Sequence, residues 1–274
     1  MNIRLIATDI DGTILPPGGA VSPATRHVVA QCRLKNIPFV ICSGRWYPNA
    51  HATALDAGLS GSDYLLAVNG NLIATMDGGV IAENPIPTAE AERIHAMTRE
   101  DSETLMSFHR NVLYITSRTG FFPRHEGVHG TIGGEEYRCE HLSMAEYERR
   151  ALKMPLKLEA LNRDQQALER MRHRLVAAGL SVSSSCPHNL EIMTQKMGKG
   201  HGVSRLAEIL GIQKSEIMVF GDYTNDLDMF RAAGWPVAVG NAVEELKNAA
   251  RMIAPRCEED GVARTIQKYV LGEQ

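Results

Sequence analysis

Short hydrophobic runs alternate with longer amphipathic segments through the first 84 residues of the chain. Three of these runs have the length and composition of buried strands: Ile3 to Ala7, Ile37 to Cys42 and Tyr64 to Val68. Two helices are expected between them, one from Ser22-Pro23 to about Asn36 and one from Tyr47 to Ala57. Strands separated by helices of this length are typical of a parallel, doubly wound sheet.

The middle of the chain has a different pattern. A hairpin is predicted around Asp77-Gly78-Gly79, and a proline-containing connector follows at residues 83–88. The serine-rich segment 183–188 is interpreted as the return connector. The elements expected between the connectors are a helix from Thr88, a hairpin near Thr104 to Thr116, a loop-rich stretch from Gly120 to Gly134, a helix behind the capping box Ser143 to Glu146, a strand from Leu156 and a helix from Asn162 to Ala178.

The alternating pattern returns after the second connector. Gly198-Lys199-Gly200 opens a helix to about Leu210, and Ile217 to Phe220 is the next predicted strand. The sequence therefore predicts an α/β protein with a doubly wound (Rossmann-like) parallel sheet core and an inserted α+β cap domain. The expected boundaries are 1–84 and 187–274 for the core and 85–186 for the insert.

Composition and charge narrow the possible partners. The chain of 274 residues is 44% hydrophobic and carries a net charge of −3, so no basic face for nucleic acid or an anionic membrane is expected. No hydrophobic stretch approaches the roughly 18 residues of a membrane span, and the first strand leaves no room for a signal peptide. Five scattered cysteines lack metal or redox spacing. A cytoplasmic location is expected.

Acidic residues follow two of the hydrophobic runs. Asp9 and Asp11 come after the first strand, and Asp222 and Asp226 come after the run that ends at Phe220. In open α/β sheets, ligands bind outside the carboxyl ends of the strands, so the two acidic groups are expected to meet there. The segment Ser43-Gly44-Arg45 follows another strand, and the helix start at Lys199 favours an anion.

Carboxylates of this kind suit a hard cation such as Mg²⁺. A phosphate monoester carries about −1.5 to −2 charges, and Asp9, Asp222 and Asp226 would add three more. At about 4 Å and an effective dielectric near 20, each like-charge pair costs roughly 4 kcal/mol. Lys199 alone cannot offset this repulsion, whereas a divalent ion between Asp9, Asp222 and the phosphate removes most of it.

The same residues indicate covalent phosphoryl transfer. Asp9 would attack phosphorus to form an aspartyl-phosphate. Asp11, two residues later, would protonate the leaving alkoxide and then take a proton from the hydrolytic water.

The motifs resemble those of the haloacid dehalogenase-like superfamily. The matching segments, in the family's order, are Asp9-Ile10-Asp11-Gly12-Thr13, Ser43-Gly44-Arg45, Lys199 and Gly221-Asp222-Tyr223-Thr224-Asn225-Asp226. The large insertion between the second and third motifs is similar to the Cof-type (subfamily IIB) sugar phosphatases, as are Val239 to Ala242 and Glu259 to Val262. The second acid, Asp11, separates the chain from the true dehalogenases, which lack it.

The resemblance implies a role for each motif residue. It implies that Asp9 is the nucleophile and that Asp11 is both acid/base and metal ligand through its backbone carbonyl. It further implies phosphate binding by Ser43, Gly44, Lys199 and Asn225, and Mg²⁺ binding by Asp222 with Asp226 in support. Cys257 stands where many relatives have asparagine, which leaves the role of that position open.

The expected activity is Mg²⁺-dependent hydrolysis of a small phosphorylated metabolite, by resemblance a sugar phosphate. A phosphomutase needs the same acids, and a non-enzymatic phospho-ligand sensor uses a similar acidic pocket, so both remain alternatives. The sequence leaves the physiological ester and the oligomeric state open. Lys157, Asn189, Glu191 and His109 could contact the substrate from the insert.

Two other motifs are rejected. His125-Glu126-Gly127-Val128-His129 matches the zinc-protease pattern, but Pro123 and the glycines in and after the segment disfavour the helix that this chemistry needs. Residues 193–200 lack the first glycine and the final Ser/Thr of a Walker A loop, which disfavours ATP binding by that route.

Overall fold

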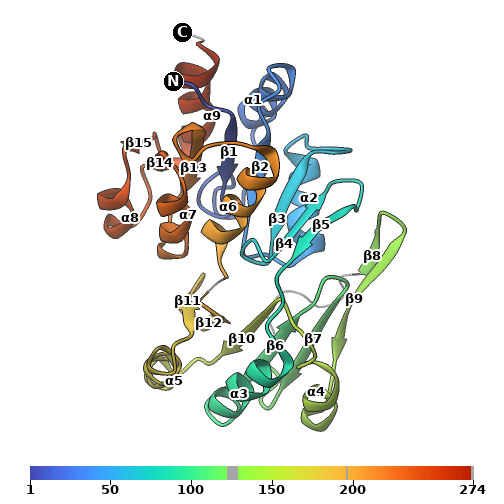
Figure 1. Cartoon of the computed structure of the whole chain (residues 1–274). Coiled ribbons are helices and arrows are strands. Elements are labelled where there is room, and N and C mark those ends of the chain that lie inside the picture. The colour runs from blue at the N-terminus through green and yellow to red at the C-terminus, as the bar shows by residue number, and fades with distance from the viewer. Residues whose placement is uncertain (122–128, 196, 273–274) are drawn as a thin grey trace. The chain divides into compact units, whose positions relative to one another are not determined.

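The computed structural model describes residues 1–121, 129–195 and 197–272. The chain divides into two compact units (Figure 1). Unit 1 comprises Met1–Ala82 and Gly198–Gln274, and unit 2 is the continuous segment Glu83–Met197. The second unit is therefore inserted into the sequence of the first.

Unit 1 is built on an eight-stranded sheet with the order β15-β14-β13-β1-β2-β3-β4-β5. Its strands are β1 (Leu5–Thr8), β2 (Phe39–Cys42), β3 (Tyr64–Ala67), β4 (Leu72–Thr75), β5 (Val80–Glu83), β13 (Ile217–Gly221), β14 (Trp235–Ala238) and β15 (Met252–Ile253). The strands from β15 to β3 pair in parallel, whereas β4 returns antiparallel to β3. The central strand β1 lies between β2 and β13, which come from opposite ends of the chain.

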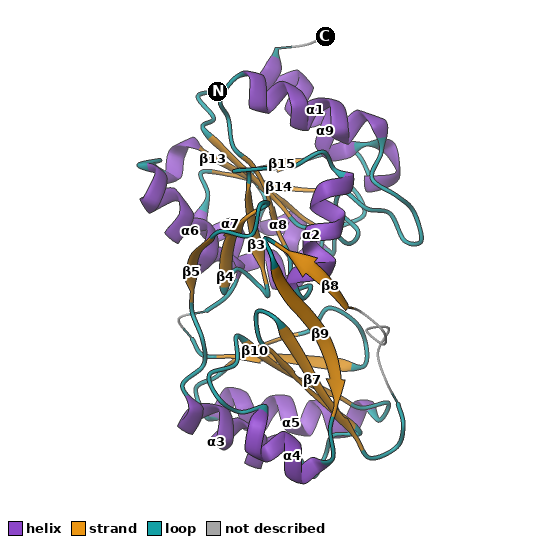
Figure 2. Cartoon of the chain, turned by 90° about the vertical axis from the view of Figure 1, so that its right-hand side faces the viewer, coloured by secondary structure: helices purple, strands orange, loops and turns teal. Residues whose placement is uncertain are grey.

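Helices lie on both faces of this sheet (Figure 2). They are α1 (Pro23–Leu34), α2 (Tyr47–Asp56), α6 (Lys199–Leu210), α7 (Leu227–Ala232), α8 (Glu244–Ala249) and α9 (Gly261–Ile266). The start of α1 is set as expected, because the Ser22 hydroxyl accepts the backbone N–H of Thr25 and Pro23 opens the first turn. The predicted doubly wound α/β fold is confirmed.

Unit 2 is a seven-stranded sheet with the order β11-β12-β10-β6-β7-β9-β8. Its strands are β6 (Thr104–Phe108), β7 (Val112–Ser117), β8 (His129–Ile132), β9 (Glu135–His141), β10 (Lys157–Leu161), β11 (Ser181–Ser183) and β12 (Asn189–Met193). Its helices are α3 (Thr88–Thr98), α4 (Met144–Arg150) and α5 (Gln165–Ala177). Leu158, Ala160, Leu190 and Ile192 belong to the same buried cluster as side chains of these helices. Because side chains alternate along a strand, the helices cover one face of the sheet.

Two sequence expectations for this region are wrong. In the stretch from Gly120 to Gly134, which was expected to be loop-rich, residues 122–128 lie outside the described residues, and His129–Ile132 form β8, with β9 directly after it. The segment 183–188 is not the return connector, because β12 follows it and pairs with both β10 and β11 in the sheet of unit 2. The second unit therefore ends at Met197 instead of at the expected residue 186. A polar, glycine-containing hairpin and a short edge strand carry too little hydrophobic periodicity to be seen in sequence.

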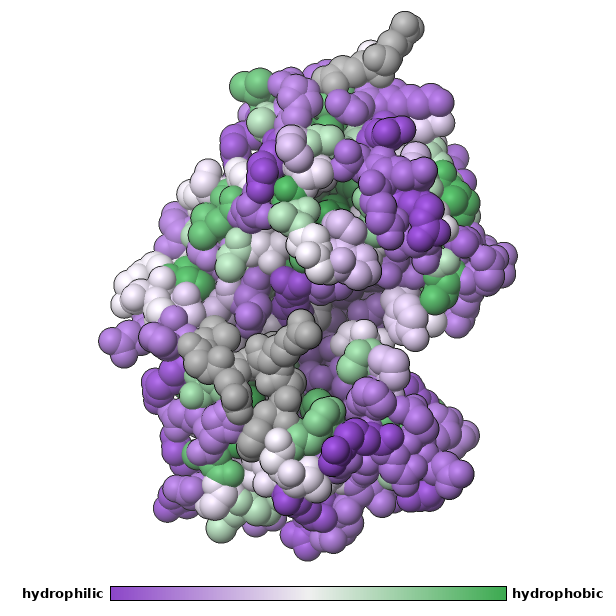
Figure 3. All heavy atoms as spheres, turned by 180° about the vertical axis from the view of Figure 1, so that it is seen from behind, coloured by the Kyte–Doolittle hydropathy of each residue, from purple (hydrophilic) through white to green (hydrophobic). Residues whose placement is uncertain are grey.

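Among the described residues, none of the helices combines the length and the hydrophobicity that crossing a bilayer requires. On the face seen in Figure 3, hydrophobic side chains are scattered among polar ones. Scattered apolar side chains of this kind are normal on a protein surface.

Candidate active site

Asp9 follows β1 at the carboxyl end of the central strand. Its backbone N–H donates to the carbonyl of Phe220 on β13 at 3.0 Å, which fixes the chain where it leaves the sheet. The residue is only 6% exposed. The polar ends of β1, β2 and β13 meet here because these strands are parallel neighbours, as the topology of a doubly wound sheet requires.

Lys199 connects two carboxylates in the interior. It is the first residue of α6 and is 1% exposed. Its Nζ lies 2.6 Å from Oδ1 of Asp9 and 2.6 Å from Oδ1 of Asp226. A close approach of backbones sets this position: a Cβ on Gly200 would lie 2.2 Å from the carbonyl oxygen of Asp228. Glycine at position 200 therefore lets the start of α6 lie against α7.

Asp226 holds the loop after β13 in shape. Its Oδ2 accepts the backbone N–H groups of Asp222 at 3.0 Å and Tyr223 at 3.3 Å, while its Oδ1 accepts from Lys199. Asp222 itself accepts a hydrogen bond from the Thr13 hydroxyl at 3.2 Å. Carboxylate oxygens of Asp9, Asp222 and Asp226 all lie within 4.8 Å of one another.

This crowding of negative charge changes the titration of the cluster. Burial, reinforced by the neighbouring Asp226 and opposed by Lys199, raises the pKa of Asp9 to about 7. Burial and the same neighbour raise the pKa of Asp222 to about 6. Burial alone would lower the pKa of Lys199, but the carboxylates of Asp226 and Asp9 hold it well above its usual value. The cluster therefore disfavours full ionisation unless a further positive charge is bound.

Asp11 is oriented differently. Its carboxylate forms a two-pronged ion pair with Arg45, with Nε to Oδ2 at 2.8 Å and Nη2 to Oδ1 at 2.5 Å, and its side chain is 62% exposed. Arg45 is in turn held by the Thr53 hydroxyl on α2 at 2.8 Å. The Asp11 carboxylate therefore lies against Arg45. It does not belong to the group of carboxylates formed by Asp9, Asp222 and Asp226.

The remaining predicted residues lie at the ends of neighbouring elements. Ser43 follows β2, is 1% exposed, and its hydroxyl accepts the backbone N–H of Arg45 at 3.2 Å. Gly44 comes next and is partly buried. Asn225 lies in the 3₁₀ turn Thr224–Asp226, and its buried Oδ1 has no hydrogen-bond partner among the described residues. An unpaired buried oxygen at such a position indicates an absent ligand or water.

Three supporting interactions were not found from the sequence. Asp228 accepts the backbone N–H of Gly200 at 2.8 Å. The side chain of Asn241 donates to the Gly12 carbonyl at 2.7 Å and accepts the backbone N–H of Cys257 at 2.8 Å. Position 257 therefore contributes its backbone, a contact that does not require asparagine there. The sequence signal for Asn241 is the segment Val239 to Ala242, which is similar to a Cof-type signature.

Gly12 allows the first loop to pass close to Asp222. Its φ is +75°, and a Cβ there would lie 2.3 Å from Oδ2 of Asp222. We expect Gly12→Ala to displace this carboxylate and to lower kcat/KM at least about 100-fold, because a misplacement of about 1 Å in a site can cost that much even away from the reacting atoms. Gly18→Ala is the matched control, since Gly18 also has positive φ but meets nothing within 4 Å. Steady-state kinetics of the two variants would test this, and equal losses would contradict it.

The weaker candidates of the insert lie in unit 2. Lys157 and Glu191 are buried and form an ion pair at 3.0 Å, and the amide of Asn189 donates to Glu159 at 2.7 Å. His109 lies at the turn after β6. The rejected zinc motif lies outside the described residues except for His129, which begins β8.

The donor set fits a hard divalent cation. The atoms brought together by Asp9, Asp222 and Asp226 are carboxylate oxygens, and Asn225 adds an amide oxygen without a partner among the described residues. Oxygen ligands of this kind suit Mg²⁺ or Ca²⁺, whereas copper and zinc favour sites with nitrogen or sulfur. Both oxygens of Asp226 already accept hydrogen bonds, so the available donors are mainly those of Asp9 and Asp222.

In a doubly wound sheet, ligands bind at the carboxyl ends of the strands, which is where the acidic loops of this chain meet Lys199 of α6. The family model of haloacid dehalogenase-like hydrolases matches residues 6–266 of the chain. The chain therefore belongs to the haloacid dehalogenase-like hydrolases, as its motifs predicted.

Curated relatives span nearly the whole chain. It is 26% identical to an HMP-PP phosphatase of Serratia proteamaculans, over 97% of this chain and 95% of that protein. It is also 26% identical to a 5-amino-6-(5-phospho-D-ribitylamino)uracil phosphatase of Bacillus subtilis, over 99% and 97%. The prediction that the chain is an enzyme of this phosphatase-containing family is confirmed.

Solved structures show the same fold. A haloacid dehalogenase-like hydrolase from B. subtilis superposes with a TM-score of 0.83 at 24% identity, covering 98% of this chain and 100% of the other. A subclass IIB sugar phosphatase superposes with a TM-score of 0.77 at 18% identity, covering 97% and 98%. At these identities the likeness extends to the fold.

Proposed function

We propose that the protein is a Mg²⁺-dependent phosphatase that hydrolyses a small phosphorylated metabolite, a sugar phosphate, through an aspartyl-phosphate intermediate. The observation that carries the proposal is the buried contact of Lys199 with Asp9, beside Asp222 and Asp226, at the carboxyl end of the central strand. A carboxylate so placed can act as a nucleophile, and the lysine can hold the anionic group that it attacks.

Asp9 is the proposed nucleophile. Its carboxylate oxygen attacks phosphorus, the new P–O bond forms, and the bond to the ester oxygen breaks. The leaving alkoxide takes a proton from Asp11, and the resulting Asp11 carboxylate then takes a proton from the attacking water. Water cleaves the aspartyl-phosphate, which releases inorganic phosphate and restores Asp9. In this assignment Asp11 leaves its ion pair with Arg45 during turnover.

Four groups are assigned to the phosphate. Lys199 supplies a buried positive charge, and the hydroxyl of Ser43, the backbone of Gly44 and the amide of Asn225 supply hydrogen bonds. Lys199 is held by Asp226, which also shapes the loop of Asp222. A preorganised lysine of this kind stabilises the transferring phosphoryl group without reorganisation at the moment of reaction.

Asp9, the backbone carbonyl of Asp11 and Asp222 are assigned to Mg²⁺, with Asp226 in support. When bound, the ion neutralises the carboxylates and the phosphate and polarises the phosphoryl oxygens. The raised pKa values of Asp9 and Asp222 support this assignment, because they indicate a site that is short of positive charge.

Metal binding is expected to depend on pH. Protons and Mg²⁺ compete for Asp9 and Asp222, whose pKa values are about 7 and about 6 in the metal-free protein. Their deprotonated forms bind the ion, so the apparent affinity should rise as the pH increases from about 5.5 to 8. The Mg²⁺-induced increase in thermal midpoint, measured at both pH values, tests this.

Chelation of divalent ions should also abolish turnover, and chelator-resistant activity would contradict the assignment.

Unit 2 is proposed to be the specificity domain. Unit 2 lies between the second and third motifs in the sequence, which supports this proposal. A second support is that a subclass IIB sugar phosphatase has the same fold. Several curated relatives are named as phosphatases of small phosphorylated metabolites. A small metabolite ester is therefore the proposed substrate, without a nucleic-acid or membrane partner.

The decisive experiment is a turnover assay. The purified protein with Mg²⁺ should release many equivalents of inorganic phosphate from p-nitrophenyl phosphate and from at least one member of a sugar-phosphate panel. Isomer formation without phosphate release would identify a mutase instead. Binding without turnover would identify a sensor.

A further inference from the structure

Arg45 has one counter-charge, and the proposed reaction takes it away. Its guanidinium donates to both oxygens of Asp11, from Nε to Oδ2 at 2.8 Å and from Nη2 to Oδ1 at 2.5 Å. Among the described residues, Asp11 is the only carboxylate that forms an ion pair with Arg45. Each oxygen of Asp11 accepts one N–H of the guanidinium. A carboxyl group that delivers a proton to the ester oxygen therefore gives up at least one of these two bonds.

Arg45 itself is held by contacts that do not involve Asp11. Its Nη1 donates to the Thr53 hydroxyl on α2 at 2.8 Å. Its backbone N–H donates to the Ser43 hydroxyl at 3.2 Å, and its carbonyl accepts the N–H of Val68 at 3.0 Å. When Asp11 turns away, Nε and Nη2 stay in place as a pair of donors that has lost its acceptor. A charged donor that loses its acceptor costs free energy unless another group replaces it.

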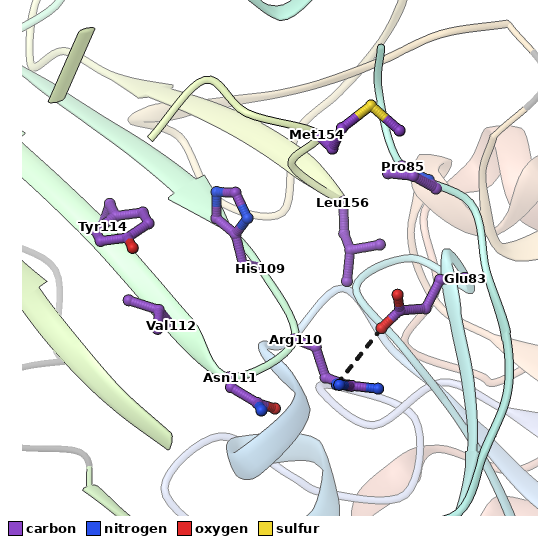
Figure 4. Close-up of a pocket in the computed structure, with 9 residues that line it drawn as sticks. All are labelled: Glu83, Pro85, His109, Arg110, Asn111, Val112, Tyr114, Met154 and Leu156. Carbon is purple, nitrogen blue, oxygen red and sulfur yellow. Dashed lines mark ion pairs between the residues drawn. The ribbon is translucent and has the colours of Figure 1, made fainter. Parts of the chain in front are cut away.

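Arg110, which lines a pocket of about 460 Å³, provides a contrast (Figure 4). Its Nη2 lies 3.3 Å from Oε2 of Glu135. No step of the proposed reaction involves Glu135, so Arg110 keeps this counter-charge throughout turnover. An arginine paired with a carboxylate does not by itself indicate a ligand. The indication at Arg45 comes from the assigned role of Asp11, which has to move.

The ion pair of Arg45 with Asp11 is accessible to a solute. The side chain of Arg45 is 28% exposed and that of Asp11 is 62% exposed. Ion pairs that are open to water contribute little to stability, so an incoming anion can replace Asp11 at small cost. The planar guanidinium fork matches the two oxygens of a carboxylate, and a carboxylate already occupies it in the free protein.

The exchange also limits where the carboxylate of a ligand lies. An aspartate side chain is short and has few rotamers. The position of the Asp11 carboxyl group at Arg45 and its position at the ester oxygen are therefore close together. A substrate carboxylate that takes the first position has to be only a few bonds away from the ester oxygen.

We propose that Arg45 binds a carboxylate of the substrate in the place that Asp11 vacates, and that the substrate is a phosphorylated short-chain sugar acid. This inference rests on the proposed phosphatase function and deepens it, because it assigns the leaving group. The carboxylate of the substrate displaces Asp11 from Arg45 and so frees the acid for the ester oxygen. A neutral sugar phosphate has no group that replaces Asp11, and its hydrolysis requires the ion pair to break without compensation.

The test compares two esters that differ only at the proposed carboxylate. D-Glycerate 3-phosphate carries it, whereas sn-glycerol 1-phosphate has the same configuration with a hydroxymethyl group in its place. With the full-length protein and Mg²⁺, kcat/KM for the first ester should exceed that for the second at least about tenfold, the usual effect of hydrogen bonds to a charged group. Turnover of p-nitrophenyl phosphate, which has no carboxylate, reports the phosphatase activity independently.

Variants test whether the preference depends on Arg45. Arg45→Gln should remove the preference for the glycerate ester, and Arg45→Lys, which keeps the charge without the planar fork, should retain part of it. Thr53→Val removes only the hydroxyl that holds Nη1 and should also reduce the preference, which provides an independent test if the Arg45 variants do not fold. Arg26→Gln is the matched control, because Arg26 pairs with Asp56 at the surface, and it should keep the wild-type preference.

The outcomes separate this inference from the proposed function. Equal kcat/KM values for the two esters, beside turnover of p-nitrophenyl phosphate, would overturn the inference and leave the phosphatase proposal intact. Equal losses toward both esters in Arg45→Gln would also overturn it, because Arg45 would then act on the transferring phosphate or on Asp11 alone. No turnover of any of the three esters would overturn the proposed function and the inference with it.

Discussion

Replacing Asp9 with asparagine should abolish phosphatase turnover, with kcat lowered at least about 10³-fold. Asparagine has nearly the same shape but cannot form the acyl phosphate bond. Lys199 keeps its second partner, Asp226, so the lysine that is assigned to the phosphate should stay in place. Single-turnover and steady-state phosphate release would measure the loss. The ³²P label that a ³²P-labelled ester transfers to the wild-type protein should be absent from the variant.

The loss should not reflect misfolding. The pKa of Asp9 is raised to about 7, which means that the folded protein disfavours its charge. A neutral asparagine should therefore leave the thermal midpoint of the metal-free protein at pH 8 unchanged or higher. Asp56→Asn is the matched control, because Asp56 pairs with Arg26 at the surface, and it should keep full activity. Retention of more than about a tenth of wild-type activity in Asp9→Asn would contradict the assignment of Asp9 as the nucleophile.

Replacing Lys199 with methionine should remove activity and also destabilise the fold by about 3–5 kcal/mol, the usual result of breaking a buried ion pair from one side. Lys199 is 1% exposed and contacts two buried carboxylates, so methionine would leave Asp9 and Asp226 without compensation. Urea unfolding of the metal-free protein would measure the change. Lys214→Met, at an exposed position, is the control and should have little effect.

The deficit of Lys199→Met should grow with pH. A carboxyl group whose pKa is raised in the folded state stabilises the folded state when the pH is below its pKa in the unfolded chain, near 3.8. This contribution is lost as the pH rises through the raised pKa of the folded state. Loss of Lys199 raises the pKa of Asp9 further, since the lysine now opposes the shift. The free energy of unfolding of the variant should therefore be closer to that of the wild-type protein at pH 5 than at pH 8. A deficit that does not change with pH would contradict this electrostatic account.

The sequence was informative about the core because each signal there is local. The strands β1, β2, β3 and β13 are hydrophobic runs, and the helices between them begin and end at recognisable residues such as Ser22 and Gly211. Where the chain leaves a parallel strand, polar residues mark the ligand edge of the sheet. These rules predict from the sequence that Asp9 and Asp222 lie at the same edge of the sheet, and their carboxylates do lie within 4.8 Å of each other.

The insert was less predictable because its strands are shorter and more polar. β8 and β9 contain glycine, histidine, glutamate and arginine at positions that a buried strand would fill with hydrophobic residues. β12 pairs with β10, a contact between distant segments that no local pattern specifies. Its Glu191 lies directly opposite Glu159, an unfavourable pairing that depends on Lys157 for compensation.

The sequence by itself determined the family, the α/β core, and the residues that carry the candidate chemistry, since hydrophobic periodicity and short motifs are properties of neighbouring positions. Only the tertiary structure decided which of these charged residues pair with one another. It brought Lys199 against Asp9 and Asp226, turned Asp11 toward Arg45, and formed the pocket around Arg110. Pairing and burial depend on segments far apart in the chain, and they set the pKa values on which the proposed reaction depends.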